Sequence, residues 1–315
     1  MRARAPGKLV LSGAYSVLRG SPALVSAVNR YAFATTNAPA TFESEEVRAF
    51  LDALPRGQRP PHPNLDAAAL RTSVPGGSRK LGLGSSAALL SAAIMAVLTE
   101  LEQTQPPPED VFWRALDAHR RAQGGGSGID VAASVFGRVL RFELTEGQPS
   151  WARACLPREL VVEVWAMTEA ASTSDFVRRV FSLETREPNS FERLFSAQAE
   201  AARAAATALQ TGSSLEFIRA LGAQAMALRE LGAASQVPIV LPVLDKLRPK
   251  LPEHAAWLPS GAGGGDVTLY IGTEPSPSSF RRAAAETSLT RLDLELDAEG
   301  VALTEEQSEL RGASQ

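Results

Sequence analysis

A stretch rich in glycine and serine, "KLGLGSSAALL" at residues 80–90, stands directly ahead of an apolar run that should be helical. Backbone N–H groups in the first turn of a helix have no partner within the helix and lie at the positive end of its dipole, so a slim loop there can surround an anion. Gly82 and Gly84 permit positive φ and close approach, and Ser85 and Ser86 offer hydroxyls to a phosphate oxygen or to Mg²⁺. The pattern predicts a phosphate site, with an ordinary serine cap on a core helix as the alternative.

Two further glycine-rich loops occur in the chain. "GGGSGIDVAASVFG" (124–137) places Asp130 at the end of a glycine-rich turn, where it either does chemistry or merely caps a helix over 131–136. "PSGAGGGDVTLYI" (259–271) supplies another such loop ahead of an expected strand. Three loops of this kind are hard to explain as turns alone, so their combination favours an anion-binding site.

Composition narrows the class of protein. The chain has 315 residues, 44% of them hydrophobic, which suffices for one large domain or two ordinary ones with a sizeable core. Charged residues make up 21% and the formal net charge is −3, so a nucleic-acid partner is not expected. Cys155 is the one cysteine and the three histidines are scattered, which excludes an internal disulfide and a zinc-type ligand cluster. A cytoplasmic location is expected.

Alternating strands and helices are expected to position the loops. Strands are expected at 9–11, 23–28 and 31–34, followed by an exposed proline-rich loop at 55–63. Helices are expected at 86–101, 110–123 and 131–136, and strands at 139–144 and 160–167. The helix at 86–101 would span roughly 24 Å, short of the ~30 Å hydrocarbon core, so a buried helix and no membrane contact are expected.

The segment "TEGQPSWARACLPRE" (145–159) is the expected linker between two domains, which are placed at 1–155 and 156–315. In the second part the pattern predicts helices at 190–211, 214–232 and 277–287, a strand after the third glycine-rich loop and another at 290–296. The last dozen residues are expected to fray.

Three segments, taken in order, resemble the three motifs of the galactokinase, homoserine kinase, mevalonate kinase and phosphomevalonate kinase superfamily, the GHMP kinases. They are "APGKLVLSGAYSVL" (5–18), "KLGLGSSAALL" and "SGAGGGD" (260–266). "AHRRAQGGGSGIDVAASVFG" (118–137), "TEAASTSDFV" (168–177) and the lysine ahead of the central loop, Lys80, are similar to the phosphomevalonate kinase branch. The order and spacing of the motifs span nearly the whole chain.

The resemblance implies an α+β fold of two domains, the first like domain 2 of ribosomal protein S5 and the second ferredoxin-like, with the active site between them. It implies ATP and Mg²⁺ as cofactors. The central loop would wrap the ATP phosphates through Gly82, Leu83, Gly84, Ser85, Ser86 and Ala87, with Ser85 or Ser86 on Mg²⁺ and with Gly263 and Gly264 nearby. Lys8 and Asp130 match the catalytic positions, although Lys8 could also be a plain strand-edge lysine.

The expected reaction is ATP-dependent phosphorylation of phosphomevalonate to diphosphomevalonate, so the partner is a small phosphorylated or hydroxylated carboxylic acid. The second pKa of the acceptor phosphate is ~6, so Asp130 would orient the acceptor more than deprotonate it. The negative charge of the acceptor phosphate requires nearby cations and hydrogen-bond donors. The candidate substrate-binding residues are Lys80, Ser127, Gly128, Ser172, Thr173 and Ser174, with Arg178 and Arg179 behind them. The alternatives are a solvated loop lysine at 80, a helix cap at 172–174 and helix-surface arginines.

Two positions depart from the family pattern. Ala14 stands where many relatives have glutamate, and His119 stands about where mevalonate kinases place a metal-binding glutamate, unless it is simply a packed helix residue. Two alternatives therefore stay open beside the expected function. One is the same chemistry on an alcohol, as in mevalonate kinase, and the other is a catalytically silent nucleotide or metabolite sensor.

Overall fold

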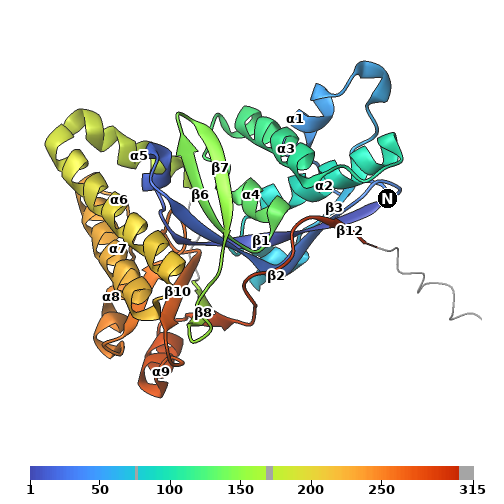
Figure 1. The fold of residues 1–315 in the computed structure, drawn as a ribbon. Coiled ribbons are helices and arrows are strands. Elements are labelled where there is room, and N and C mark those ends of the chain that lie inside the picture. Colours follow the sequence, from blue (N-terminus) through green and yellow to red (C-terminus); the bar gives the residue numbers. More distant parts are fainter. Residues whose placement is uncertain (75–76, 168–172, 305–315) are drawn as a thin grey trace, which may run out of the picture.

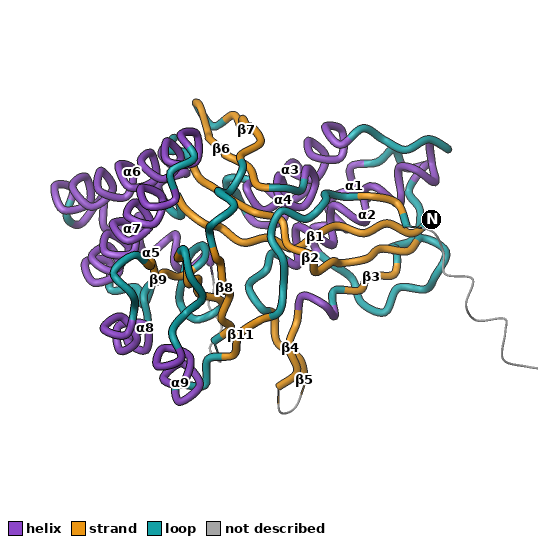
Figure 2. Tube along the Cα trace, turned by 60° about the horizontal axis from the view of Figure 1, so that its bottom comes forward, coloured by secondary structure: helices purple, strands orange, loops and turns teal. Residues whose placement is uncertain are grey.

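Two antiparallel β-sheets, each packed against helices, organise the chain (Figure 1). The computed structural model describes residues 1–74, 77–167 and 173–304. Helices α1–α4 gather around the first sheet, and helices α5–α9 gather around the second (Figure 2). The arrangement confirms the predicted α+β class.

The first sheet has the strand order β12-β1-β2-β6-β7, with β3 paired to the far end of β2. Its strands are β1 (Arg2–Ser12), β2 (Ala23–Thr35), β3 (Asn64–Asp66), β6 (Val139–Thr145), β7 (Gln148–Ala154) and β12 (Ala302–Leu303). Strand β1 pairs with β2 along its length and with β12 at Ala3 and Arg4, and it is buried along most of its length.

Four helices belong to this half of the chain: α1 (Glu45–Ala53), α2 (Ser85–Glu102), α3 (Pro108–Gln123) and α4 (Ile129–Phe136). Helix α2 packs on β1 and β2 and also touches α3 and α4, which explains why it is apolar on every side. Its length and composition would allow it to cross a membrane, but 78% of it is buried inside the protein. It is the buried helix expected from the sequence.

The second sheet has the strand order β11-β8-β10-β9 and is antiparallel throughout. Its strands are β8 (Val161–Ala166), β9 (Ala255–Pro259), β10 (Val267–Gly272) and β11 (Thr290–Leu292). Numbered within this half, the order is 4-1-3-2 with helices after the first and third strands, which is the ferredoxin-like arrangement. The helices are α5 (Thr173–Arg186), α6 (Pro188–Thr211), α7 (Ser214–Ser235), α8 (Pro242–Leu247) and α9 (Ser278–Glu286).

The predicted linker 145–159 is wrong in part, because it contains strand β7. Glu146 and Gly147 have positive φ and close a tight hairpin between β6 and β7. Pro149 made this segment look unlike a strand, but β7 lies at the sheet edge, where a proline removes no needed hydrogen bond. The proposed division at residue 155 falls between β7 and β8, although β12 returns from the C-terminal part to the first sheet.

Other elements also differ from the sequence prediction. Helix α1 and the two-stranded hairpin of β4 (Arg71–Val74) and β5 (Gly77–Lys80) were not expected, and the hairpin projects from the body of the protein (Figure 2). The predicted strand 290–296 is regular only over Thr290–Leu292. Of the predicted frayed end, residues 305–315 lie outside the described part of the chain.

Candidate active site

Lys8 lies on β1 opposite Ala27 of β2, and its side chain points toward the start of α4. Its Nζ is 3.4 Å from Oδ1 of Asp130, and Lys8 as a whole is only 8% exposed. Its backbone amide donates a hydrogen bond of 2.8 Å to the carbonyl of Leu83. Lys8 is therefore more than a plain strand-edge lysine, since it is buried and joins β1, the glycine-serine loop and Asp130.

The glycine-serine loop ahead of α2, here called the phosphate loop (Gly82–Ala87), packs closely against Lys8. Gly84 is the N-cap of α2 with left-handed backbone, and no side chain caps the helix, so the serine-cap alternative is wrong. A Cβ placed on Gly84 would lie 2.9 Å from Cγ of Lys8, so the lysine stem runs directly over the loop backbone. Ser85 is buried and Ser86 half-buried at the first turn, with Leu83 and Ala87 in the core.

Asp130 lies in the first turn of α4 and does not cap it. The N-cap is Gly128, again left-handed and again without a side-chain cap. Ser127 accepts a hydrogen bond of 3.3 Å from the amide of Ile129, and a Cβ on Gly128 would overlap Leu116. The glycine-rich turn thus brings the Asp130 carboxylate, 36% exposed, to Lys8 from a position 122 residues away.

The third glycine-rich loop, here called the tip loop (Ser260–Asp266), lies against the phosphate loop. A Cβ on Gly82 would be 2.3 Å from Cβ of Asp266, so the two loops are in direct contact there. Gly263 and Gly264 are buried against Ile239, and the Gly264 amide donates a 3.0 Å hydrogen bond to the Ile239 carbonyl. Packing against Ile239 explains why glycine occurs at positions 263 and 264. The predicted contact of these glycines with the ATP phosphates stays a prediction.

The structure describes only some of the residues that were predicted to bind the acceptor. Lys80 ends β5 and is exposed, directly ahead of the phosphate loop. Its neighbour Arg79 is half-buried and donates a hydrogen bond to the carbonyl of Met167, at the end of β8. Ser172 lies outside the described residues, and Thr173 and Ser174 begin α5 without a described side-chain position.

The arginines of α5 take part in local contacts. Arg178 is exposed and pairs with Asp175 on the same helix. Arg179 donates a hydrogen bond to the carbonyl of Gln236 and lies 3.9 Å from Asp175. Both fit the helix-surface alternative.

His119 lies on α3 beside a buried carboxylate, that of Glu46, which no sequence motif marks. Glu46 of α1 accepts hydrogen bonds from Ser44 (2.9 Å) and Gln123 (2.8 Å). Burial opposes ionisation of Glu46, but these bonds, a backbone N–H bond and the charge of His119 outweigh it, so the pKa of Glu46 is lowered. His119 also sits against Gly126 of the second glycine-rich loop, and it therefore packs α1, α3 and that loop together.

The protein oxygen atoms at this site could hold Mg²⁺ only together with phosphate oxygen atoms. Within the described ranges 1–74, 77–167 and 173–304, no group of three or more His, Cys, Asp or Glu side chains could hold a metal ion. Mg²⁺ is commonly held by one or two protein groups together with substrate phosphates and water. Ser85 and Ser86, at a helix start whose N-cap is glycine, leave hydroxyls for that role, so the residues present fit the ion.

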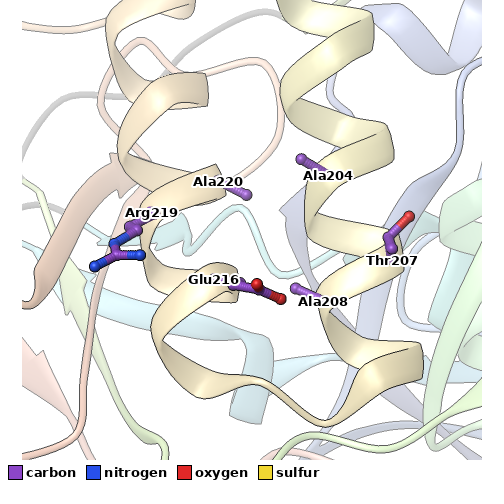
Figure 3. Close-up of a pocket in the computed structure, with 6 residues that line it drawn as sticks. All are labelled: Ala204, Thr207, Ala208, Glu216, Arg219 and Ala220. Atoms are coloured by element: carbon purple, nitrogen blue, oxygen red, sulfur yellow. The ribbon is translucent and has the colours of Figure 1, made fainter.

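A surface groove lies elsewhere, between α6 and α7 (Figure 3). It is lined by Ala204, Thr207, Ala208, Glu216, Arg219 and Ala220. Three of the six residues are alanines, the amide of Glu216 in the first turn of α7 is already bonded to Ser213, and the cation Arg219 lies beside the acid Glu216. The groove therefore lacks the glycine-rich helix start found at the phosphate loop.

Taken together, the loops provide free helix-start amides, a buried lysine and a carboxylate in one place. Phosphoryl transfer depends mainly on positioning and on neutralising charge, and these are the groups it uses. Residues 48–138, which include the phosphate loop and Asp130, match the family model described as GHMP kinases N terminal domain. This match shows that the chain contains a GHMP kinase N-terminal domain, and its two-sheet arrangement is the GHMP kinase fold of solved structures.

Individual relatives carry two different names. The chain is 27% identical over 293 residues to the mevalonate kinase of Archaeoglobus fulgidus, covering 88% of this chain and 95% of that protein. It is 26% identical to the phosphomevalonate kinase of Streptomyces sp. (strain CL190), covering 85% and 88%. The structure of Streptococcus pneumoniae phosphomevalonate kinase in complex with phosphomevalonate and AMPPNP has a TM-score of 0.75 and 18% identity, covering 94% of this chain and 99% of that one.

Proposed function

We propose that the chain transfers the γ-phosphoryl group of ATP to phosphomevalonate, giving diphosphomevalonate and ADP in the mevalonate pathway. The observation that carries the proposal is the Lys8 to Asp130 pair directly over the phosphate loop. Lys8 would stabilise negative charge on the transferred group, and the amides at the start of α2 would hold the ATP phosphates. The residues of the phosphate loop keep the roles inferred from the family resemblance.

In this reaction an oxygen of the acceptor phosphate attacks the γ-phosphorus, and the bond from that phosphorus to the β-phosphate oxygen breaks. The acceptor phosphate is largely ionised at pH 7, because its second pKa is ~6, so no base is required. Asp130 then orients the acceptor beside Lys8. Mg²⁺ bound by Ser85 or Ser86 and the phosphates would neutralise part of the triphosphate charge.

The choice of phosphomevalonate rests on the cations near the phosphate loop. Lys80 and Arg79 precede the loop in sequence, and Arg79 reaches the end of β8, directly ahead of the segment with Ser172, Thr173 and Ser174. A second phosphate beside a triphosphate requires such added positive charge. We assign Lys80 and the 172–174 hydroxyls to the acceptor phosphate, with Ser127 and Gly128 beside it.

Mevalonate is the second candidate acceptor, and the similarity to the mevalonate kinase of Archaeoglobus fulgidus favours it. An alcohol needs a general base, and Asp130 beside Lys8 could remove its proton. A silent nucleotide sensor is the remaining alternative, motivated by Ala14. The intact Lys8 to Asp130 pair argues against it, since a sensor has no need of this pair.

The test is ADP release, coupled to a spectrophotometric readout, with ATP, Mg²⁺ and either phosphomevalonate or mevalonate. We expect turnover with phosphomevalonate. The variant Lys80→Ala is expected to raise KM for phosphomevalonate about tenfold and to change KM for ATP less than twofold. Lys250→Ala, an exposed lysine far along the chain in the second half, is the matched control and should leave both constants unchanged.

Turnover of mevalonate but not of phosphomevalonate would refute the proposed acceptor. Binding of ATP without turnover of either acceptor would favour the sensor.

A further inference from the structure

Tyr15 has an unusual backbone conformation close to the site. Ala14, Tyr15 and Ser16 form a γ-turn, in which the Ser16 amide donates a 2.7 Å hydrogen bond to the Ala14 carbonyl. Tyr15 has φ 60° and ψ −54°, which is the rare, strained form of this turn. Glycine would adopt the turn without strain, so the tyrosine side chain has to make contacts that offset it.

The strained turn directs the Tyr15 side chain away from the first sheet and into the second half of the chain. The residue is 4% exposed and belongs to an apolar cluster with Phe176 and Val180 of α5 and with Ile239. Its hydroxyl donates a 2.7 Å hydrogen bond to the carbonyl of Ala262, in the tip loop. Burial raises the pKa of Tyr15 well above its ordinary value, so the hydroxyl remains a donor at every physiological pH.

We propose that Tyr15 is a positioning residue that holds the tip loop in register with the phosphate loop and with Lys8. The proposal rests on the proposed phosphoryl transfer and adds to it a residue that touches neither ATP nor the acceptor. Tyr15 follows Lys8 along the same segment of chain, while Ala262 and α5 belong to the half that carries the 172–174 segment. One side chain thus links the two halves beside the site.

The tip loop can pass a displacement on to the phosphate loop because the two are in direct contact. Asp266 ends the tip loop and fills the space beside Gly82, where an added Cβ would be only 2.3 Å away. Ser260, at the other end, donates a 3.0 Å hydrogen bond to the carbonyl of Val10 on β1. Ala262 lies between Ser260 and Gly264, whose amide is bonded to the Ile239 carbonyl, so losing the bond to Tyr15 loosens the loop between those two attachments.

The test compares Tyr15→Phe with Tyr270→Phe. Tyr270 is the matched control, because it is also a buried tyrosine whose hydroxyl donates to a backbone carbonyl, that of Glu274 at 3.1 Å, within the second sheet. Both variants lose one buried hydroxyl. Steady-state kinetics, AMPPNP affinity and hydrogen exchange of the 261–265 amides are measured for each.

We expect Tyr15→Phe to lower kcat about tenfold, to change AMPPNP affinity less than twofold and to speed exchange in 261–265. Tyr270→Phe is expected to keep wild-type kcat and wild-type exchange in that loop. Wild-type kcat and exchange in Tyr15→Phe, or an equal fall of kcat in both variants, would overturn the inference.

A second variant covers the case in which Tyr15→Phe is too unstable to measure. Ser260→Ala removes another side-chain tether between the first half and the tip loop, and it should likewise lower kcat and speed exchange. If it does neither, the inference is wrong. Since the exchange measurement needs no acceptor, it judges Tyr15 even if neither mevalonate nor phosphomevalonate is turned over, an outcome that counts against the proposed function alone.

Discussion

The close contact between Gly84 and Lys8 allows a sharp test of the active-site geometry. Gly84 has φ +74°, so Gly84→Ala places a side chain in left-handed backbone, which costs roughly 1–2 kcal/mol of folding free energy. The new Cβ would also lie 2.9 Å from Cγ and 3.0 Å from Cε of Lys8, whereas ordinary contacts begin at 3.4 Å. The lysine stem must therefore move by about 0.5 Å.

That movement should loosen the pairing of Lys8 with Asp130, whose atoms are already 3.4 Å apart. Misplacement of a catalytic group by ~1 Å can cost about a hundredfold in rate, so we expect kcat of Gly84→Ala to fall between about 10- and 100-fold. Steady-state ADP release at saturating substrates measures it.

Gly212 provides the matched control, because it has φ +73° at the end of α6 and open space around its missing Cβ. Gly212→Ala should lose the same roughly 1–2 kcal/mol in urea unfolding and keep wild-type kcat. If Gly84→Ala keeps wild-type kcat as well, the position of Lys8 does not depend on the loop backbone and the reasoning fails.

Two further predictions concern carboxylates. Asp130→Asn should lower kcat at least about tenfold with little change in Tm. The control is Asp117→Asn, which changes an exposed acid on α3 and should keep wild-type kcat. An unchanged kcat in Asp130→Asn would contradict the proposed mechanism. Because the pKa of Glu46 is lowered by folding, its ionised form stabilises the protein above its ordinary pKa of 4.5, and this stabilisation is lost as the pH falls through the lowered value. Thermal unfolding should show Glu46→Gln about 2–4 °C below wild type at pH 7 and the gap closing below pH 4.5, with the exposed Glu45→Gln as control; a gap independent of pH would argue against the Glu46 assignment.

Local patterns predicted helices α2, α3, α4, α6, α7 and α9, but they gave no range for α1, α5 and α8. Helix α2 begins and ends within one residue of its prediction, because a glycine-serine loop and a long apolar run mark it on both sides. Strand β7 was not predicted, because the proline and the polar residues of this segment fit a linker as well as an edge strand. Edge strands depend on pairing with a neighbour, which no local pattern reveals.

Contacts in the candidate site between residues far apart in the sequence could not be predicted from local patterns either. The pairing of Lys8 with Asp130 was anticipated through the family resemblance and not through spacing, since 122 residues separate them. Tyr15 and Asp266 were missed, because their importance lies in contacts with Ala262 and Gly82 in other loops. A tyrosine at a positive-φ position carries no signal in the sequence, where glycine would have suggested the turn.

The return of the C-terminal segment to the first sheet limits how the two sheets can move. The chain passes from the first sheet to the second between β7 and β8, and it passes back after β11, where the Asn29 amide donates to the Glu295 carbonyl and Arg138 to that of Ala298. β12 then pairs with β1. Besides these two chain crossings, the second sheet and helices α6 and α7 share one apolar core with the first sheet. Relative motion of the two halves must therefore break contacts between them, and the hydrogen bond from Tyr15 to Ala262 is one of these contacts.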